Sequence, residues 1–291
     1  MNNQENLHKL VQENFNNVRW VITLPAIIIL LLFSAYFIFQ EGDFQTTYTQ
    51  MQIPLFLDIN HTLSALPRFE YNLTNLGNAL VGLSLLSIFL YYSPKLWGAL
   101  INASLLSLLL TYPLKKLFEM PRPASVIELS DFTIIGRTLL HKSFPSGHSI
   151  TIFIFITVLL LAFMPRMRSS LGKWFSFGFP MILLGLFIAA SRVACGAHWP
   201  LDVLIGSTIG YLLAVIGVQL DNKYPVWRWM DNDKYKWIVL VIVLVLLGLM
   251  ISKVIKHSLL TIDLLAILSL VVTAILLIKK ICSKKICSNK I

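Results

Sequence analysis

Charged side chains are scarce in this chain: Asp, Glu, Lys and Arg together make up 13% of its 291 residues. A soluble domain carries about 25% charged residues, and about half of its residues are apolar. Here hydrophobic residues reach 56%, and the mean hydropathy is +0.74. This composition excludes an ordinary soluble globular protein and indicates an integral membrane protein.

Cysteine is equally rare, because the chain holds only Cys195, Cys282 and Cys287. The number is odd, and no C-x-x-C pair or Cys/His ligand spacing occurs, so neither a disulfide framework nor a zinc site is predicted. The 14 acidic residues form no cluster that would hold a metal ion, and we expect no metal and no cofactor. Cys195 is expected to be a small buried residue, since no base is dedicated to it. The other two cysteines fall in a Lys-rich tail that we expect to be disordered.

The excess of cations gives a formal net charge of +10. Nucleic acid is not an expected partner, because the chain has neither a basic groove interleaved with aromatic residues nor zinc-finger spacing. In a membrane protein an excess of Lys and Arg usually sets the topology and contacts anionic lipid.

Long apolar runs predict eight membrane spans, and therefore an all-α, polytopic transmembrane helix bundle. The first run, Val21 to Phe39, has full span length and no A-x-A site, so we expect a retained span rather than a cleaved signal. The predicted spans are residues 20–40, 76–93, 97–117, 148–164, 176–195, 200–219, 237–255 and 259–279.

Lys and Arg are more frequent on the side of the two termini, which predicts that both termini are cytoplasmic. Many of the remaining cations nevertheless gather in the opposite connection 115–147, and Arg192 lies in the next one. Positive charge placed against the topology rule calls for another reason, and an anionic substrate provides one.

The two long connections on that side are residues 41–75 and 124–144. The first mixes aromatic and polar residues, which is typical of a short amphipathic helix at the membrane surface. The second is either a lid or an ordinary surface loop. A small-residue pattern, Gly206-Ser-Thr-Ile-Gly210, predicts close helix packing within the core rather than between protomers.

Three polar stretches lie at the mouths of spans on this same side. In the first, Lys115 ends a span, and Arg122 follows seven residues later between Pro121 and Pro123. The prolines break the helix and hold Arg122 in an extended segment. A lysine point charge and an arginine fork together suit a phosphate. The alternative is a pair of interfacial side chains that extend toward water.

The second stretch is Pro145-Ser146-Gly147-His148, directly before an apolar run. Pro and Ser at this point indicate the start of a helix. Free backbone N–H groups there form an anion site, and Gly147 lets a ligand approach closely. His148 would stand beside that anion as an acid or a base. The alternative is a capped helix with an interfacial histidine.

The third stretch runs from Ser191 and Arg192 to His198 and Asp202. Pro200 suits the first turn of a helix, so Asp202 falls in that turn and can reach back to His198. A carboxylate on one imidazole nitrogen fixes the tautomer and leaves the other nitrogen as a nucleophile. The alternative is that Asp202 merely caps the helix.

At these residues the sequence resembles the type 2 phosphatidic acid phosphatase (PAP2) superfamily. The three-part pattern reads Lys115…Arg122-Pro123, Pro145-Ser146-Gly147-His148 and Ser191-Arg192…His198…Asp202, within residues 76–219. The resemblance implies that His198 attacks phosphorus, that Asp202 orients it, and that His148 protonates the leaving oxygen and then activates water. It also implies that Lys115, Arg122, Arg192 and the backbone N–H groups of Ser146 and Gly147 hold the phosphoryl oxygens.

The resemblance further implies a six-span phosphatase core, to which this chain adds two C-terminal spans. We expect residues 1–75 to hold the first span and the outer interfacial loop, 76–236 the PAP2-like catalytic core, and 237–291 the two added spans and a basic cytoplasmic tail. The implied function is a phosphatase of membrane lipids at the periplasmic face of a bacterial inner membrane, through a phosphohistidine intermediate. Lipid A 1-phosphate and undecaprenyl diphosphate are favoured slightly as substrates. Phosphatidylglycerophosphate or phosphatidate, a phosphotransferase with the same site, and a lipid transporter or scaffold remain alternatives; the oligomeric state is open.

Overall fold

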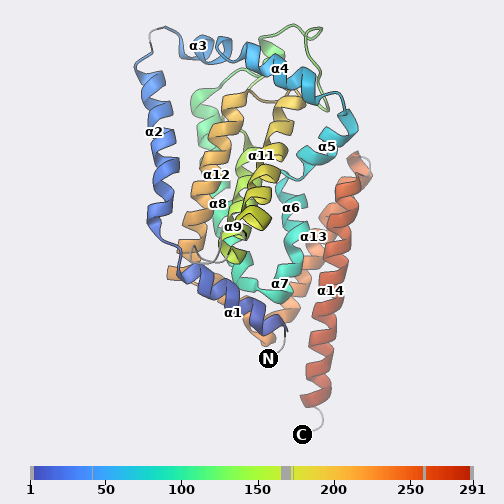
Figure 1. Cartoon of the computed structure of the whole chain (residues 1–291). Helices are drawn as coiled ribbons and strands as arrows, with labels where there is room; N and C mark the ends of the chain where they lie inside the picture. Colours follow the sequence, from blue (N-terminus) through green and yellow to red (C-terminus); the bar gives the residue numbers. More distant parts are fainter. Residues whose placement is uncertain (1–2, 41, 165–171, 173, 258–259, 289–291) are drawn as a thin grey trace.

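The computed structural model describes residues 3–40, 42–164, 172, 174–257 and 260–288. These residues form an all-helical bundle with no strand among them (Figure 1). The elements are α1 (Asn3–Asn16), η1 (Trp20–Thr23), α2 (Leu24–Ile38), α3 (Phe44–Gln50), α4 (Ile53–Leu63), α5 (Pro67–Asn75), α6 (Ala79–Leu85), η2 (Leu86–Ile88), α7 (Phe89–Tyr92), α8 (Pro94–Phe118), η3 (Pro123–Ser125), α9 (Gly147–Phe163), η4 (Trp174–Gly178), α11 (Phe179–Ala194), α12 (Pro200–Lys223), η5 (Val226–Asp231), η6 (Asp233–Tyr235), α13 (Lys236–His257) and α14 (Thr261–Ser288).

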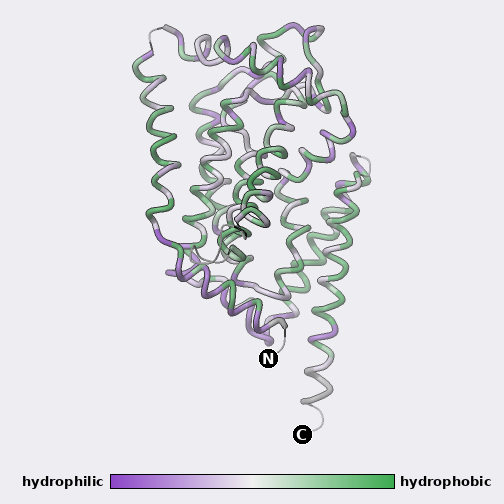
Figure 2. The backbone as a smooth tube through the Cα atoms, in the orientation of Figure 1, coloured by the Kyte–Doolittle hydropathy of each residue, from purple (hydrophilic) through white to green (hydrophobic). Residues whose placement is uncertain are grey.

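Six of these helical segments are long and apolar enough to cross a membrane, and a seventh span is possible if a bent pair is counted as one. The bent pair is Pro67–Asn75 with Ala79–Tyr92, which turns by 74°. Helix α9, Gly147–Phe163, is apolar but shorter. The predicted all-helical, multi-pass architecture is confirmed, but the predicted number of eight spans is not, because six or seven described segments meet the length and hydropathy requirement and α9 does not. Figure 2 shows the apolar residues along the bundle and hydrophilic ones at its two ends.

Helix α12 lies at the centre of the bundle, where glycines let its neighbours approach. A Cβ atom on Gly206 would lie 2.7 Å from the carbonyl oxygen of Ser146. A Cβ on Gly210 would overlap the carbonyl oxygen of Ile150, and one on Gly217 would lie 2.8 Å from that of Ala99. Helices α9 and α8 therefore pack directly on α12. The prediction that the Gly206–Gly210 pattern serves packing within the core is confirmed.

Helices α3, α4 and α5 occupy the segment predicted to be interfacial, and α3 and α4 lie across one end of the bundle (Figure 1). We call this end the site face. Asn60 of α4 holds the neighbouring connection 119–146, because its side chain donates to the carbonyl of Thr133 at 2.9 Å and accepts from the Thr133 amide at 2.9 Å. The amide of Ile135 donates to the carbonyl of Cys195 at 3.2 Å. The connection is thus anchored at its middle.

The opposite face carries α1, which the sequence analysis left without an element. Figure 1 shows α1 crossing this end of the bundle. Three side chains fasten it and the residues after it: Asn14 donates to the carbonyl of Ala162 at 2.7 Å, Asn222 to that of Phe15 at 2.8 Å, and Gln219 to that of Val18 at 2.7 Å. The polar N-terminal stretch is therefore part of the folded protein.

The last two helices, α13 and α14, form a hairpin beside α5, α6 and α7 (Figure 1). Ser269 of α14 donates to the carbonyl of Leu85 at 2.8 Å, and Ser87 lies 3.2 Å from Thr273. The expected disorder of the Lys-rich tail is wrong for residues up to Ser288, where α14 is still helical. The segment contains neither Gly nor Pro, so nothing in its backbone chemistry ends the helix. Residues 289–291 and the side chain of Cys287 lie outside the described part.

Candidate active site

The first turn of α12 builds the centre of the site. Pro200 occupies the first helical position, and Asp202 lies in the first turn. Oδ2 of Asp202 is 3.2 Å from Nδ1 of His198 and accepts from the Trp199 amide at 2.9 Å. His198 and Asp202 are both buried. The carboxylate therefore caps the helix and holds the imidazole at the same time, so the two roles considered for Asp202 are not alternatives.

The tautomer of His198 follows from its two partners. Nη1 of Arg122, which can only donate, lies 3.3 Å from Nε2. Nε2 therefore carries the lone pair, and Nδ1 carries the proton that is donated to Asp202. The pKa of His198 lies well below its usual range. The largest cause is burial, and the next are the positive charges of Arg122, Arg192 and Lys115 and the neighbouring His148. The imidazole is thus neutral at pH 7, and the lone pair of Nε2 accepts from Arg122.

Arg122 is buried and fixed by backbone carbonyls. It has the extended conformation that the flanking prolines predict, with φ −88° and ψ 163°. Nε donates to the carbonyl of His141 at 2.9 Å, Nη2 to that of Lys142 at 3.3 Å, and Nη1 to that of Ala197. The guanidinium is therefore preorganised beside His198.

The two other cations approach from different elements. Lys115, in the last turn of α8, donates to the carbonyl of Lys142 at 2.7 Å. Arg192, in the last turn of α11, donates from Nη1 to Oγ1 of Thr74 at 2.7 Å. Nε of Arg192 is buried and has no hydrogen-bond partner among the described residues. Arg192 thus retains donors for an anionic ligand.

Ser146 is the N-cap of α9, and its Oγ accepts from Oγ of Ser149 at 2.8 Å. Its own amide donates to the carbonyl of Asp202 at 3.1 Å. Of the two amides expected to face a phosphate, that of Ser146 is thus already engaged. The amides of Gly147 and His148, the first two residues of α9, have no acceptor within the helix.

The structure therefore brings all three polar stretches together at the site face. The charges that act on His198 come from α8, from the segment after it, from α9 and from α11. In sequence these groups are spread from Lys115 to Asp202, and the fold gathers them around one imidazole.

Two hydroxyl groups that the sequence analysis did not single out complete the environment of Asp202. The hydroxyl of Tyr48 in α3 donates to Oδ1 at 2.6 Å, and that of Ser143 donates to Oδ2. Burial, followed by the negative charge of Asp202, raises the pKa of Tyr48 well above its usual range. One turn later, Oε1 of Gln52 accepts from the amide of Leu201 at 2.7 Å. The only signal in the sequence was the spacing of Tyr48 and Gln52, which puts both on one face of a helix.

We expect the Tyr48→Phe variant to release phosphate about tenfold more slowly than the wild type. A hydrogen bond to a charged group contributes about 1.5–3 kcal/mol, and its loss leaves Oδ1 of Asp202 buried without that donor. Initial rates in detergent measure the effect. Tyr36→Phe is the matched control, because Tyr36 is 50% exposed on α2. Equal rates for Tyr48→Phe and the wild type would show that Asp202 does not depend on Tyr48.

The thiol of Cys195 lies beside the site without belonging to its chemistry. Cys195 is 1% exposed. Burial raises the pKa of this thiol to about 11, so it stays protonated at neutral pH.

The described residues also contain no group of three or more His, Cys, Asp or Glu side chains placed to hold a metal ion.

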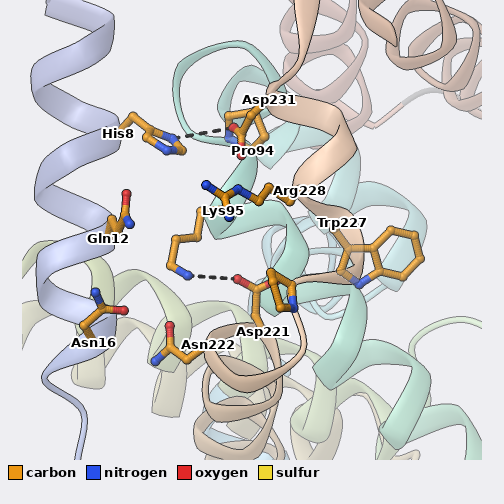
Figure 3. A pocket seen from close by; sticks show the side chains of 11 residues that line it. His8, Gln12, Asn16, Pro94, Lys95, Asp221, Asn222, Trp227, Arg228 and Asp231 are labelled. Atoms are coloured by element: carbon orange, nitrogen blue, oxygen red, sulfur yellow. Dashed lines mark hydrogen bonds and ion pairs between the residues drawn. The ribbon is translucent and has the colours of Figure 1, made fainter.

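A separate cavity of about 300 Å³ lies at the other end of α12 (Figure 3). Asp221, which lines it, is 19 residues after Asp202, and this separation corresponds to about 28 Å of helix. Figure 3 shows His8 of α1 facing Asp231 at 3.7 Å and Lys95 facing Asp221 at 3.3 Å. These pairs join α1 to η5 and α8 to the last turns of α12, far from His198.

The comparison with known families bears on the region that carries the site. The model of the PAP2 superfamily matches residues 96–225, which include all eight residues of the predicted site. Residues 96–225 are thus similar to the PAP2 superfamily. The PAP2 region thus runs from the start of α8 to the end of α12, and the α13–α14 hairpin lies outside it.

Two curated proteins are similar to part of this chain. The undecaprenyl-diphosphatase of Sulfolobus acidocaldarius is 30% identical over 105 residues, which are 34% of this chain and 46% of that protein. The putative undecaprenyl-diphosphatase YbjG of Escherichia coli is 34% identical over 106 residues, 35% of this chain and 46% of that protein. The chain thus spans about half the length of these relatives. The crystal structure of Aquifex aeolicus LpxE is 29% identical, with a TM-score of 0.49, over 58% of this chain and 95% of that one.

Proposed function

We propose that the protein is a membrane lipid phosphatase that works through a phosphohistidine on His198. The observation that carries this proposal is the neutral imidazole of His198, with Nδ1 bonded to Asp202 and the lone pair of Nε2 directed at Arg122. A nucleophile flanked by cations at the end of a helical membrane bundle suits a phosphate group on a lipid.

In the first step, Nε2 attacks phosphorus while the bond from phosphorus to the leaving oxygen breaks. The negative charge of the bound phosphate favours the protonated form of His148, which gives its proton to that oxygen as the P–N bond forms. In the second step, His148 takes a proton from water, the resulting hydroxide attacks phosphorus, and the P–N bond breaks to release phosphate. Asp202 stabilises the positive charge that develops on His198 in the first step.

The phosphoryl oxygens would lie among Lys115, Arg122, Arg192 and the amide of Gly147. Arg122 now donates to Nε2 of His198, and a phosphoryl oxygen would take over this bond as the nucleophile engages phosphorus. Ser146 would act through its side chain, which caps α9 and so presents the Gly147 amide. Charge stabilisation by fixed donors would supply most of the catalysis.

A lipid substrate is supported by the position of the site, at the ends of helices that carry exposed apolar side chains such as Leu31, Leu108 and Leu244. The tail would stay in the bilayer while the head group enters among the cations. Undecaprenyl diphosphate is the first candidate, because both curated relatives are named as undecaprenyl-diphosphatases. Lipid A 1-phosphate, phosphatidylglycerophosphate and phosphatidate are the other substrates to test.

We place the site face on the periplasmic side of a bacterial inner membrane and both termini in the cytoplasm. The bias of Lys and Arg toward the side of the termini supports this orientation. The cations at the site face, which run against this bias, would be retained for the substrate.

A phosphate-release assay with the purified full chain in detergent tests the function. We expect release from undecaprenyl diphosphate at least tenfold faster than from phosphatidate, without added metal. Release from lipid A alone would change the substrate assignment. Transfer of phosphate to a second lipid, with none set free, would establish the phosphotransferase instead. No reaction with any of the four lipids would overturn the proposal in favour of a transporter or scaffold.

A further inference from the structure

Asp263 is a fully buried acid near the start of α14, in a helix that is otherwise apolar for most of its length. Oδ1 accepts from Nζ of Lys253 in α13 at 2.7 Å and from Nδ2 of Asn75 at 2.8 Å. Oδ2 is buried without a hydrogen-bond partner among the described residues. An acid is costly at such a position in a membrane protein, so its presence calls for a functional reason.

Asn75 belongs to the turn 74–78, which joins α5 to α6 and contacts two residues of the site. Thr74 accepts from Nη1 of Arg192 at 2.7 Å. Gly77 lies directly on His148, because a Cβ atom there would be 2.9 Å from Cβ and 3.0 Å from the carbonyl oxygen of His148. Within the turn, the amide of Gly77 donates to the carbonyl of Thr74 at 3.0 Å.

Other contacts hold the α13–α14 hairpin to the bundle without touching this turn. Ser269 donates to the carbonyl of Leu85, and Ser87 lies beside Thr273, both further along α14. Apolar residues such as Ala266 and Leu270 are buried along the same helix. The Lys253–Asp263 ion pair is therefore only one of several contacts that dock the hairpin, and among the described residues it is Asp263 that reaches Asn75.

We propose that Asp263 is a positioning residue, which holds the turn 74–78 through Asn75 and thereby sets the places of Arg192 and His148. The two helices outside the PAP2 region would then contribute to phosphate binding without touching the substrate. This role rests on the proposed function only in that Arg192 binds a phosphoryl group.

The experiment measures the dissociation constant of inorganic phosphate for the full chain in detergent, by thermal shift, so it needs no turnover. We expect Asp263→Ala and Asn75→Ala each to weaken phosphate binding about tenfold. The double variant Asp263→Asn/Lys253→Met keeps a side-chain oxygen for Asn75 and removes the lysine that would otherwise be unpaired. Its dissociation constant for phosphate should stay within threefold of the wild type. Ser269→Ala, the control on the same helix, should stay within twofold.

A double-mutant cycle separates positioning from general damage. In a Thr74→Val background, where the bond to Arg192 is already lost, Asp263→Ala should add less than a twofold effect. Three results would each overturn the proposal. The losses of phosphate affinity could multiply in the double variant, Ser269→Ala could lose as much affinity as Asp263→Ala, or both Asp263→Ala and Asn75→Ala could bind phosphate like the wild type. Phosphate binding by a wild type that hydrolyses no lipid would refute the proposed function while leaving this inference open to the same measurement.

Discussion

We expect the His198→Ala variant to lose at least about 10⁴-fold in the rate of phosphate release, the scale seen when an enzyme loses its nucleophile. Nε2 of His198 faces Arg122, while Nδ1 is occupied by Asp202. Without the imidazole the site keeps its cations and still binds phosphate, but it has no atom on which to form the intermediate. Initial rates with the preferred lipid, and the melting temperature in detergent, measure the two sides of this expectation.

His8→Ala is the matched control for this variant, since His8 lies at the other end of the bundle and its ion-pair partner is Asp231. It should keep more than half of the wild-type rate. Phosphoprotein should form in the wild type, trapped at alkaline pH, and be absent from His198→Ala. A His198→Ala protein that keeps more than about 1% of the rate would show that another group is the nucleophile.

Local rules were sufficient to predict the arrangement of His198 and Asp202. Their spacing of four residues, with Pro200 between them, fixes a helix start and therefore the side from which the carboxylate reaches back. The extended backbone of Arg122 followed in the same way from its two flanking prolines. Such features need no knowledge of the rest of the fold.

The support of Asp202 by Tyr48 could not be predicted, because these residues are 154 positions apart. Whether α3 lies over α12 depends on packing between helices, which hydrophobic periodicity does not encode. The amide of Ser146 illustrates the same limit. A helix start predicts free N–H groups, but only the close approach of α9 to α12 at Gly206 turns that amide toward the carbonyl of Asp202.

At the level of the fold, hydropathy located the long apolar helices but neither their breaks nor the short length of α9. The second predicted span is divided into α6, η2 and α7, after a bend that Asn78 creates by accepting from the amides of Leu80 and Val81. The bend matters because the turn before it contacts Arg192 and His148. A tally of apolar residues cannot distinguish such a broken span from a continuous one.

The second large effect is expected for His148→Ala, and it should depend on the leaving group. With phosphatidate, a phosphomonoester whose alkoxide leaving oxygen needs a proton, the rate of phosphate release should fall about 10³-fold. With an aryl phosphate, whose leaving group departs as a stable anion, the first step should survive. One equivalent of the phenol should then be released per site, and turnover should cease after it.

Turnover should cease because His148 also activates the water that hydrolyses the intermediate, and an aryl leaving group does not replace this role. Phosphorylated His198 should therefore accumulate in His148→Ala, whereas it cannot form in His198→Ala. The two variants have similar losses in steady state but opposite amounts of phosphoprotein, and this contrast assigns the two histidines. Equal losses on both substrates, with no burst and no phosphoprotein, would instead mean that His148 supports the geometry of α9 and moves no proton.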